Sequence, residues 1–402
     1  MKIAMFTNNY KPYVGGVPVS IEHLAQALRK IGHTVYIFAP SYENEEEEEF
    51  VVRYPSFPVK IAGAPVPNVL TSLFLKKVTE LGIDIIHVHH PAIVGNVALA
   101  IRKKTGIPVV FTYHTRYEAY LHYIKPLEKL EEHTGVLEKY LNYFCNKCDL
   151  IVAPTPGIAS YLQQTNLDTP VGIMPTGIPE ENFHAEPSRT EEIRKQYAKD
   201  ADYLFCTVSR LAEEKNLDFQ LEALVQLKEL LGAQGKRFRH LIIGEGPKHK
   251  ELAGRISALG LKENVIFLGN VPNTEIKNFQ AASDLFLFTS KSETQGIVLL
   301  EAMAVGNPVI AVDASGVRDI VKDGVNGYLT REDAGEFAAQ TAAVLSENAK
   351  YQKLCEGAGR TAESYREECV AKTAELYYVS TRARTLQEVR KTSFFHRYVV
   401  NS

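Results

Sequence analysis

Two glutamates, Glu293 and Glu301, are eight residues apart in the segment SETQGIVLLE at 292–301. The segment follows an apolar run at 285–288, so we expect a strand, a short polar loop, a glycine and then a helix that carries the second acid. At about 1.5 Å per residue, Gly296 to Glu301 spans roughly 7–8 Å of helix. The free N–H groups at the start of that helix suit a phosphate, and a carboxylate can accept hydrogen bonds from paired sugar hydroxyls. The spacing predicts a nucleotide-sugar site, although a solvated helix face is the ordinary alternative for such a pair.

The composition indicates a soluble protein of two domains. A chain of 402 residues is too long for one compact core, and a net charge of −3 gives no sign of nucleic-acid binding. No stretch resembles a signal peptide or a membrane span of about 20 apolar residues. The five cysteines are an odd number, which favours reduced thiols and a cytoplasmic setting. Cys145 and Cys148 form a C-x-x-C pair late in a helical-looking run, where buried helix cysteines are favoured over a redox or metal site.

The order of elements predicts an α/β fold with two doubly wound domains. In the first half we expect strands at 2–7, 34–39, 83–88, 109–113 and 150–153, with amphipathic helices such as 18–30 between several of them. In the second half we expect strands at 204–208, 240–243, 265–268, 285–289 and 308–312. Continuous apolar strands that alternate with helices predict parallel sheets covered on both faces. The turn-rich sequence PTGIP at 175–179 places the domain boundary after residue 177.

Two further segments fall where a strand ends, which is where parallel sheets bind ligands. Gly15 and Gly16 follow the opening strand and would let the backbone approach a ligand, although an ordinary tight turn is equally compatible. Arg210 and Lys215 follow the strand at 204–208 and could meet a pyrophosphate, each contact being about 4 kcal/mol at an effective dielectric of about 20. A solvated basic pair is the alternative. No Asp-x-Asp motif that would hold a divalent ion is present, so we expect no metal.

Histidines end two of the strands in the first half. His114 follows the strand at 109–113 and would face the ligand, although a lone histidine more often packs or caps. His87 and His89 alternate onto one face, so a metal site is conceivable, but no nearby acid or cysteine clearly completes a ligand set.

Taken together, these segments resemble the family 4 glycosyltransferases of GT-B fold, in which two Rossmann-like domains face each other across a cleft. The resemblance covers nearly the whole chain. It rests on the early glycines, on His114, on Arg210 with Lys215, on GEGP at 244–247, and on the Glu293-x7-Glu301 spacing.

The resemblance implies a retaining transfer from a nucleoside-diphosphate sugar without a metal or other cofactor. Arg210 and Lys215 would hold the diphosphate, Glu293 would bind hydroxyls of the donor sugar, and His114 would contact that sugar near the reacting carbon. The remaining donor-binding residues implied are Gly15, Gly16, Val17, Val271, Thr294, Gln295, Gly296, Ile297 and Glu301. Among these, Glu301 would bind the ribose and Val271 would lie near the base. The domains implied are 1–177 for the acceptor and 178–374 for the nucleotide sugar, with 375–402 crossing back to the first; we expect the end of this tail to be irregular.

A narrower resemblance concerns the acceptor. The segments at 292–296 and 113–123 are similar to those of bacterial 1,2-diacylglycerol 3-alpha-glucosyltransferases, which implies transfer of a hexose, glucose in those enzymes, to diacylglycerol in a membrane. The sequence leaves the choice between UDP-glucose and UDP-galactose open. The apolar and basic segments LTSLFLKK at 70–77 and RKK at 102–104 could contact such a surface, which predicts a cytoplasmic protein peripheral to the inner face of the cell membrane. The alternative for these segments is a core-facing helix with a solvated basic end.

Three other readings stay open. The same reaction could use a soluble acceptor such as a small alcohol or a glycan. The chain could be a catalytically silent GT-B partner, although Arg210, Lys215 and Glu293 together argue against it. A glycan phosphorylase shares the fold, but the sequence offers no separate sign of its pyridoxal phosphate lysine. The sequence leaves the oligomeric state open.

Overall fold

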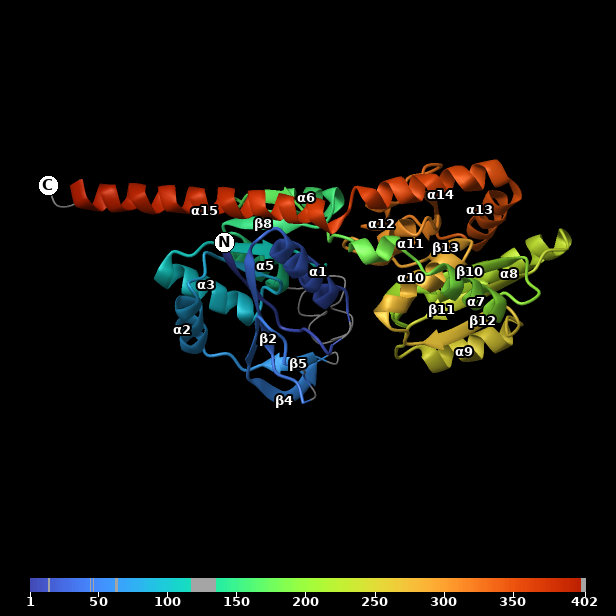
Figure 1. Cartoon of the computed structure of the whole chain (residues 1–402), viewed down its shortest axis with the longest axis horizontal. Helices are drawn as coiled ribbons and strands as arrows, with labels where there is room; N and C mark the ends of the chain where they lie inside the picture. Colours follow the sequence, from blue (N-terminus) through green and yellow to red (C-terminus); the bar gives the residue numbers. More distant parts are fainter. Residues whose placement is uncertain (14, 44, 46, 62–63, 117–134, 399–402) are drawn as a thin grey trace. The chain divides into compact units, whose positions relative to one another are not determined.

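The chain folds into two compact units. The computed structural model describes residues 1–402 except 14, 44, 46, 62–63, 117–134 and 399–402, and it does not describe the side chains of 58, 60, 61, 64, 65 and 388–398. Unit 1 comprises Met1–Gly177 with Glu367–Ser402, and unit 2 comprises Ile178–Arg366 (Figure 1). The chain re-enters unit 1 at Glu367, eight residues before the predicted start of the returning segment at 375, because Val370, Ala371 and Ala374 pack into the core of unit 1.

Unit 1 is a parallel sheet with helices on both faces. Its sheet has the strand order β3-β2-β1-β6-β7-β8-β9, and a separate antiparallel hairpin, β4–β5, follows β3. The strands are β1 (Lys2–Phe6), β2 (Thr34–Pro40), β3 (Val51–Tyr54), β4 (Ser56–Ile61), β5 (Ala64–Pro67), β6 (Ile85–Val88), β7 (Val109–Thr112), β8 (Leu150–Ala153) and β9 (Val171–Ile173). The helices are α1 (Gly16–Lys30), α2 (Thr71–Leu81), α3 (Val94–Thr105), α5 (Val136–Cys145), α6 (Pro156–Gln163) and α15 (Glu367–Tyr398).

The strands of unit 1 are apolar along their length because both faces of the sheet are covered. Phe6 and Phe111 pack on one face with residues of α2 and α3, whereas Met5 and Val110 pack on the other with residues of α1 and α15. The sequence predicted the five central strands of this sheet, including β1 and β6. It missed the short strands β3 and β9, since each is brief and lies at an edge of the sheet.

Unit 2 has the same architecture. Its parallel sheet has the strand order β12-β11-β10-β13-β14-β15. The strands are β10 (Tyr203–Val208), β11 (Phe238–Ile243), β12 (Val265–Gly269), β13 (Leu285–Phe288), β14 (Val309–Val312) and β15 (Gly327–Thr330). The helices are α7 (Pro187–Tyr197), α8 (Leu217–Ala233), α9 (His249–Ala258), α10 (Asn273–Ala282), α11 (Ile297–Ala304), α12 (Val317–Ile320), α13 (Ala334–Ser346) and α14 (Asn348–Glu363), with 3-10 turns η2 (Glu180–Phe183) and η3 (Glu213–Lys215). The predicted doubly wound α/β fold is therefore confirmed.

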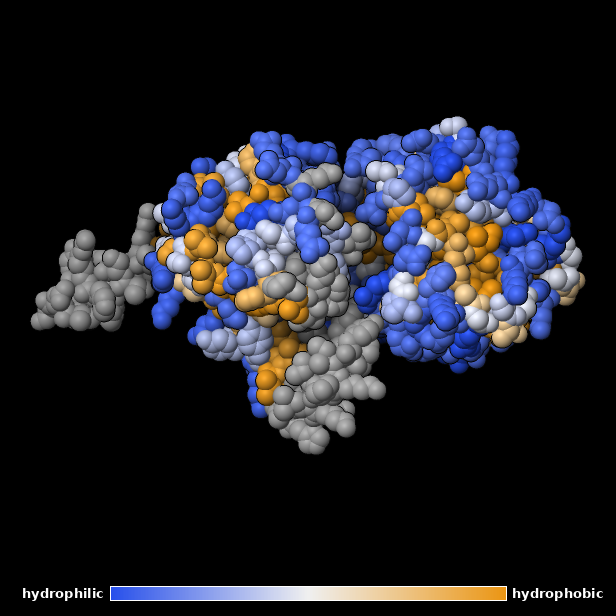
Figure 2. Space-filling view, turned by 90° about the horizontal axis from the view of Figure 1, so that it is seen from below, coloured by the Kyte–Doolittle hydropathy of each residue, from blue (hydrophilic) through white to orange (hydrophobic). Residues whose placement is uncertain are grey.

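Large apolar side chains are exposed on one part of unit 1. Phe57 and Val59 of β4, and Leu70 and Leu73 at the start of α2, are each about half exposed or more. Figure 2 shows hydrophobic side chains on the lower face of this unit, where β4, β5 and α2 are labelled in Figure 1. Phe74, by contrast, is buried against Phe6 and other rings, so the segment 70–77 is divided between the core and the surface. No helix in the described part of the chain is long and apolar enough to span a bilayer.

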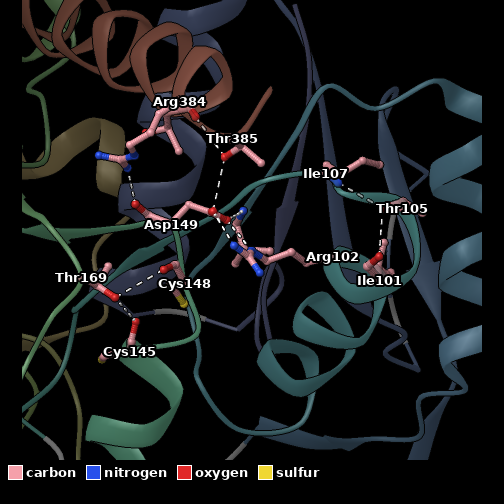
Figure 3. Close-up of polar contacts among 12 residues, drawn as sticks. Ile101, Arg102, Thr105, Ile107, Cys145, Cys148, Asp149, Thr169, Arg384 and Thr385 are labelled. Atoms are coloured by element: carbon pink, nitrogen blue, oxygen red, sulfur yellow. Dashed lines mark hydrogen bonds and ion pairs between the residues drawn. The ribbon is translucent and has the colours of Figure 1, made fainter. Parts of the chain in front are cut away.

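Helix α15 joins the far end of the chain to unit 1. It packs along α1 and runs unbroken from Glu367 to Tyr398, so the predicted irregular tail is wrong. Its Arg384 donates to the carbonyl oxygen of Asp149, and its Thr385 donates to the Asp149 carboxylate at 3.3 Å (Figure 3). From the sequence we expect Phe394, Phe395 and Tyr398 near the end of the chain to pack against a domain surface, and these side chains lie outside the described ones.

The Asp149 carboxylate also binds Arg102 of α3. Both contacts from the guanidinium to the carboxylate oxygens are 2.7 Å, and the Asp149 side chain is almost fully buried. The guanidinium of Arg102 is therefore paired within unit 1, and of the predicted basic cluster only Lys103 and Lys104 are exposed. The nearby cysteines behave as predicted: Cys145 and Cys148 are buried free thiols, and burial raises the pKa of Cys145 to about 12. Cys148 lies just beyond the end of α5.

Candidate functional site

The strand order of unit 2 brings two of the predicted loops together. Strand β10 lies between β11 and β13, so the chain leaves β10 toward one side of the sheet and β13 toward the other. Ligands of open α/β sheets bind beyond the carboxyl ends of the strands at such a switch point. The loop after β10 carries Arg210 and Lys215, and the loop after β13 carries Glu293. Both predicted groups therefore lie at the one place in this sheet where a ligand is expected.

Lys215 and Glu293 form an ion pair at the switch point. The distance from Lys215 Nζ to Glu293 Oε1 is 2.6 Å, and the two side chains are 17% and 16% exposed. Burial by itself would raise the pKa of Glu293, but Lys215, helped by Ser290, outweighs this effect and holds the pKa below its usual value. The Glu293 carboxylate is therefore ionised at neutral pH, and both side chains remain partly accessible to a ligand.

Arg210 is held by a neighbour that the sequence analysis did not single out. Its guanidinium donates to Glu214 Oε1 at 2.8 Å, and the Arg210 side chain is 47% exposed whereas that of Glu214 is 5% exposed. The backbone oxygen of Glu214 accepts from the amide of Lys291 at 3.2 Å, which ties the β10 loop to the β13 loop. The spacing of four residues between Arg210 and Glu214 is the signal that could have identified this contact.

The loop after β10 is clamped by the GEGP segment. Leu211 donates its amide to the Glu245 carbonyl at 3.0 Å, and the amide of Lys248 donates to the Leu211 carbonyl at the same distance. A Cβ on Gly246 would lie 2.3 Å from the Leu211 carbonyl oxygen, so only glycine permits this approach. The GEGP segment at 244–247 therefore positions the loop that carries Arg210.

Lys248 adds a charged clamp to the same loop. Its ammonium contacts Glu213 at 2.9 Å and Glu251 at 3.3 Å, and it also binds Asp218. Burial would lower the pKa of Lys248, but the surrounding carboxylates reverse this and raise the pKa. Lys248 was not predicted, and its place next to Pro247 carried no signal of this role.

The start of α11 provides the backbone groups predicted for a phosphate or sugar. Gly296 caps the helix with φ of 74°, a left-handed conformation that favours glycine, and Ile297 begins the helix. Thr294 and Gln295 lie in the same loop, and Gln295 is buried. The carbonyl oxygen of Glu293 lies 2.5 Å from where a Cβ on Gly316 would be, so this loop rests on another close glycine contact.

Glu301 lies just over one turn into α11 and is partly buried. Burial raises the pKa of Glu301 to about 7, so the carboxyl group exchanges its proton near neutral pH. Val271 follows β12, is partly buried and packs against the core of unit 2. Glu301 therefore stands on the helix that follows β13 at the switch point, whereas Val271 follows the edge strand β12, which β11 separates from β10.

In unit 1 the predicted glycines stand at the start of α1. Gly16 begins the helix, and a Cβ added to it would meet no atom within 4 Å. A Cβ on Gly15 would come within 3.1 Å of the Tyr13 ring, and Val17 is partly buried. Gly16 thus has open space beside its backbone, as a close approach by a ligand requires.

His114 is partly buried and packs beside two buried histidines, His87 and His89. His114 Nε2 lies 2.8 Å from Nδ1 of His89, and their rings stack at 5.1 Å between centroids. Burial lowers the pKa of both rings well below the usual value, so both are neutral at pH 7. Both nitrogens of His87 are engaged, one with the Tyr378 hydroxyl and one with Thr112. Across the described residues no group of three or more histidine, cysteine or acidic side chains is arranged to hold a metal ion.

Comparison with known proteins gives two family matches. Residues 14–182 match the model for glycosyltransferase family 4, and residues 188–361 match the model for glycosyl transferases group 1. Similar curated proteins include the alpha-monoglucosyldiacylglycerol synthase of Acholeplasma laidlawii, 27% identical over 97% of this chain and 100% of that protein. The synthase of the same name from Streptococcus pneumoniae is 29% identical over 82% of this chain and 75% of that protein.

Solved structures share the fold. Anabaena HepE in complex with UDP-glucose has a TM-score of 0.73 at 21% identity and covers 96% of this chain and 100% of its own. The sucrose-phosphate synthase of Thermosynechococcus elongatus has a TM-score of 0.78 at 18% identity and covers 95% of this chain and 99% of its own.

Proposed function

The chain belongs to glycosyltransferase family 4, and from this premise we propose that it transfers glucose from a UDP-sugar to diacylglycerol with retention at the anomeric carbon. The fold and the enzyme class follow from the family, whereas the sugar, the nucleotide and the acceptor are the proposal. The observation that carries the donor half is the Lys215–Glu293 pair at the switch point of unit 2, next to Arg210.

The donor half of the proposal assigns one task to each charge. The diphosphate binds Lys215 and Arg210 and replaces their carboxylate partners. Each close cation–phosphate contact is worth about 4 kcal/mol at an effective dielectric of about 20 before desolvation. Glu293, released from Lys215, accepts hydrogen bonds from hydroxyls of the sugar. The ribose diol binds Glu301, and the first N–H groups of α11 meet phosphate or sugar oxygens. The proposal needs no metal, because two cations already face the leaving group.

Retention follows from the geometry of departure. The proposal includes no carboxylate nucleophile, because Glu293 is engaged with the sugar hydroxyls. The acceptor oxygen must then approach the anomeric carbon from the face on which the diphosphate leaves. The bond from the anomeric carbon to the phosphate oxygen breaks, a bond to the acceptor oxygen forms, and the acceptor proton passes to the departing diphosphate. Arg210 and Lys215 stabilise the charge that develops on the diphosphate.

The acceptor half rests on the surface of unit 1 and on the two similar synthases. The exposed apolar residues of β4 and α2 and the exposed Lys103 and Lys104 combine apolar contact with positive charge, as a peripheral membrane surface requires. The similar proteins from A. laidlawii and S. pneumoniae are both alpha-monoglucosyldiacylglycerol synthases. We therefore propose that unit 1 contacts the cytoplasmic face of the membrane to reach a lipid acceptor.

The experiment is a donor-by-acceptor screen read by product mass. Purified protein is given UDP-glucose, UDP-galactose or GDP-mannose with diacylglycerol in mixed micelles, with glycerol, or with a short glycan. The proposal expects a glucosyl-diacylglycerol from UDP-glucose, and loss of at least a hundredfold in Glu293→Gln and Arg210→Ala with retained folding. Equal transfer to glycerol or glycan would establish the soluble-acceptor alternative. Undiminished transfer in both variants would overturn the site assignment.

Membrane contact is tested separately by sedimentation with vesicles that contain anionic lipid. Leu73→Glu should release the protein from these vesicles, because it places a charge on an exposed apolar position without disturbing the buried Phe74. Glu80→Gln on the same helix is the matched control and should sediment as the wild type does. A Leu73→Glu protein that still sediments fully would remove α2 from the proposed surface.

A further inference from the structure

The pair formed by His114 and His89 has a feature that the proposed function does not use. His89 is 1% exposed, and its Nδ1 meets His114 Nε2 at 2.8 Å. Its other nitrogen, Nε2, is buried without a hydrogen-bond partner. Because both rings are neutral, they share a single hydrogen bond, and one ring must supply the proton.

The environment of His89 determines which of the two rings donates the proton in this hydrogen bond. If His114 donated, His89 would carry its own proton on Nε2, which would leave a buried N–H without an acceptor. Buried N–H groups without a partner are the rarest unsatisfied groups in folded proteins. If His89 donates from Nδ1, only a lone pair is left at Nε2. His89 also lines a small chamber, whose other lining residues include Thr112, Ser20 and Thr176.

The neighbouring residues fix the His89 ring in place. The His87 ring packs against it in a tilted arrangement at 4.3 Å between centroids, and His87 is itself held by the Tyr378 hydroxyl of α15 at 2.7 Å and by Thr112 at 2.6 Å. The His89 ring therefore cannot rotate to exchange its two nitrogens without disturbing a fully buried array. Such fixed second partners are how proteins set the tautomer of a functional histidine.

We propose that His89 is a positioning residue that donates from Nδ1 to His114 Nε2 and so holds His114 in the Nδ1–H tautomer. His114 then meets the donor sugar with a hydrogen-bond donor at Nδ1, whereas its Nε2 lone pair is occupied. The functional part of this inference rests on the proposed role of His114 in contacting the sugar. The tautomer itself does not, since it is a property of the free protein.

Two variants of His89 separate hydrogen bonding from packing. Asparagine places its amide nitrogen on Cγ, where histidine carries Nδ1, so His89→Asn can still donate to His114. Glutamine places its amide one bond further along, in the position of Nε2, so His89→Gln cannot. His240, a fully buried strand histidine of unit 2, gives the control variant His240→Leu.

The first readout is the tautomer, measured by nitrogen NMR of ¹⁵N-histidine-labelled protein, with the His114 signal assigned from His114→Ala. We expect the Nδ1–H form in the wild type, in His89→Asn and in His240→Leu. We expect its loss in His89→Gln, since neutral histidine side chains otherwise favour the Nε2–H form. An Nε2–H form in the wild type, or an unchanged His114 signal in His89→Gln, would overturn the proposal.

The second readout is kinetic. We expect kcat to fall about three- to tenfold in His89→Gln, as the loss of one neutral hydrogen bond implies, and to recover in His89→Asn. The KM for the donor and the binding of UDP alone should change less than about twofold in both. Equal losses in the two variants, or a loss confined to KM, would refute the positioning role. If the wild type transfers no sugar at all, the proposed function fails, while the NMR result still decides the tautomer.

Discussion

Replacing Asp149 should destabilise unit 1 more than any surface substitution, because this carboxylate joins three elements, α3, β7 and α15, at the amino end of β8. It binds Arg102 of α3 through two contacts of 2.7 Å and accepts the amide of Val109 in β7 at 2.8 Å. It also accepts the hydroxyl of Thr385 in α15 at 3.3 Å (Figure 3). Asp149→Ala leaves the Arg102 guanidinium and a buried amide without their acceptor.

The size of the effect follows from burial. Breaking a buried ion pair from one side costs about 3–5 kcal/mol, and the Arg102 side chain is 35% exposed, so we discount this to about 2–4 kcal/mol. For a unit of roughly 200 residues, each kcal/mol lowers Tm by about 2–4 °C, so Tm of unit 1 should fall by about 5–15 °C. Hydrogen exchange should quicken in α3 and α15, while unit 2 is unchanged.

The assay is thermal unfolding of the full chain, combined with hydrogen exchange followed by mass spectrometry. Asp149→Asn is the matched control and should lose less, because its amide oxygen can still accept from Val109. Arg102→Ala combined with Asp149→Ala should cost less than the sum of the single changes, since the two residues are in direct contact. A wild-type Tm in Asp149→Ala, or strict additivity in the double variant, would refute the reasoning.

Three further predictions concern unit 2. Burial raises the pKa of Glu301 to about 7, and its carboxylate binds a diol better than its acid form does. The KM for the donor should therefore fall as the pH rises from 6 to 8. The same pH response in Glu301→Gln would contradict this. Lys248→Met should lower kcat/KM by about tenfold or more by freeing the Arg210 loop, measured beside Lys250→Met as a control; equal activities would show that the clamp is dispensable. Burial lowers the pKa of His240 to about 3, so its contribution to stability is complete above about pH 6.5 and is lost as pH falls toward 3, because only the unfolded state takes up the proton. His240→Leu should flatten this acid dependence by up to about 1.4 kcal/mol per pH unit in urea unfolding, and an unchanged slope would disprove it.

The sequence supported the fold class because its signals are local. Apolar strands that alternate with helices predict parallel sheets covered on both faces, whatever the order of the strands in the sheet. The sheets of both units confirm this. The positions of the motifs at strand ends could also be predicted from the sequence. A strand followed by a glycine and a helix places the loop between them at the carboxyl end of that strand. Edge strands such as β3 and β15 gave too weak a pattern, because they are only partly buried and lack the continuous apolar run of the central strands.

The partners of the site residues depended on the tertiary structure. Lys215 and Glu293 are 78 residues apart, and they meet only because β10 and β13 are neighbours in the sheet. Arg102 was predicted as part of a basic cluster at a membrane surface, and the structure pairs it with Asp149, which lies 47 residues further along the chain, just before β8. Strand order and side-chain burial are collective results of packing the whole unit, and no local pattern encodes them. The sequence by itself therefore determined which chemical groups the protein has and on which kind of element each stands, whereas only the tertiary structure decided which of them touch.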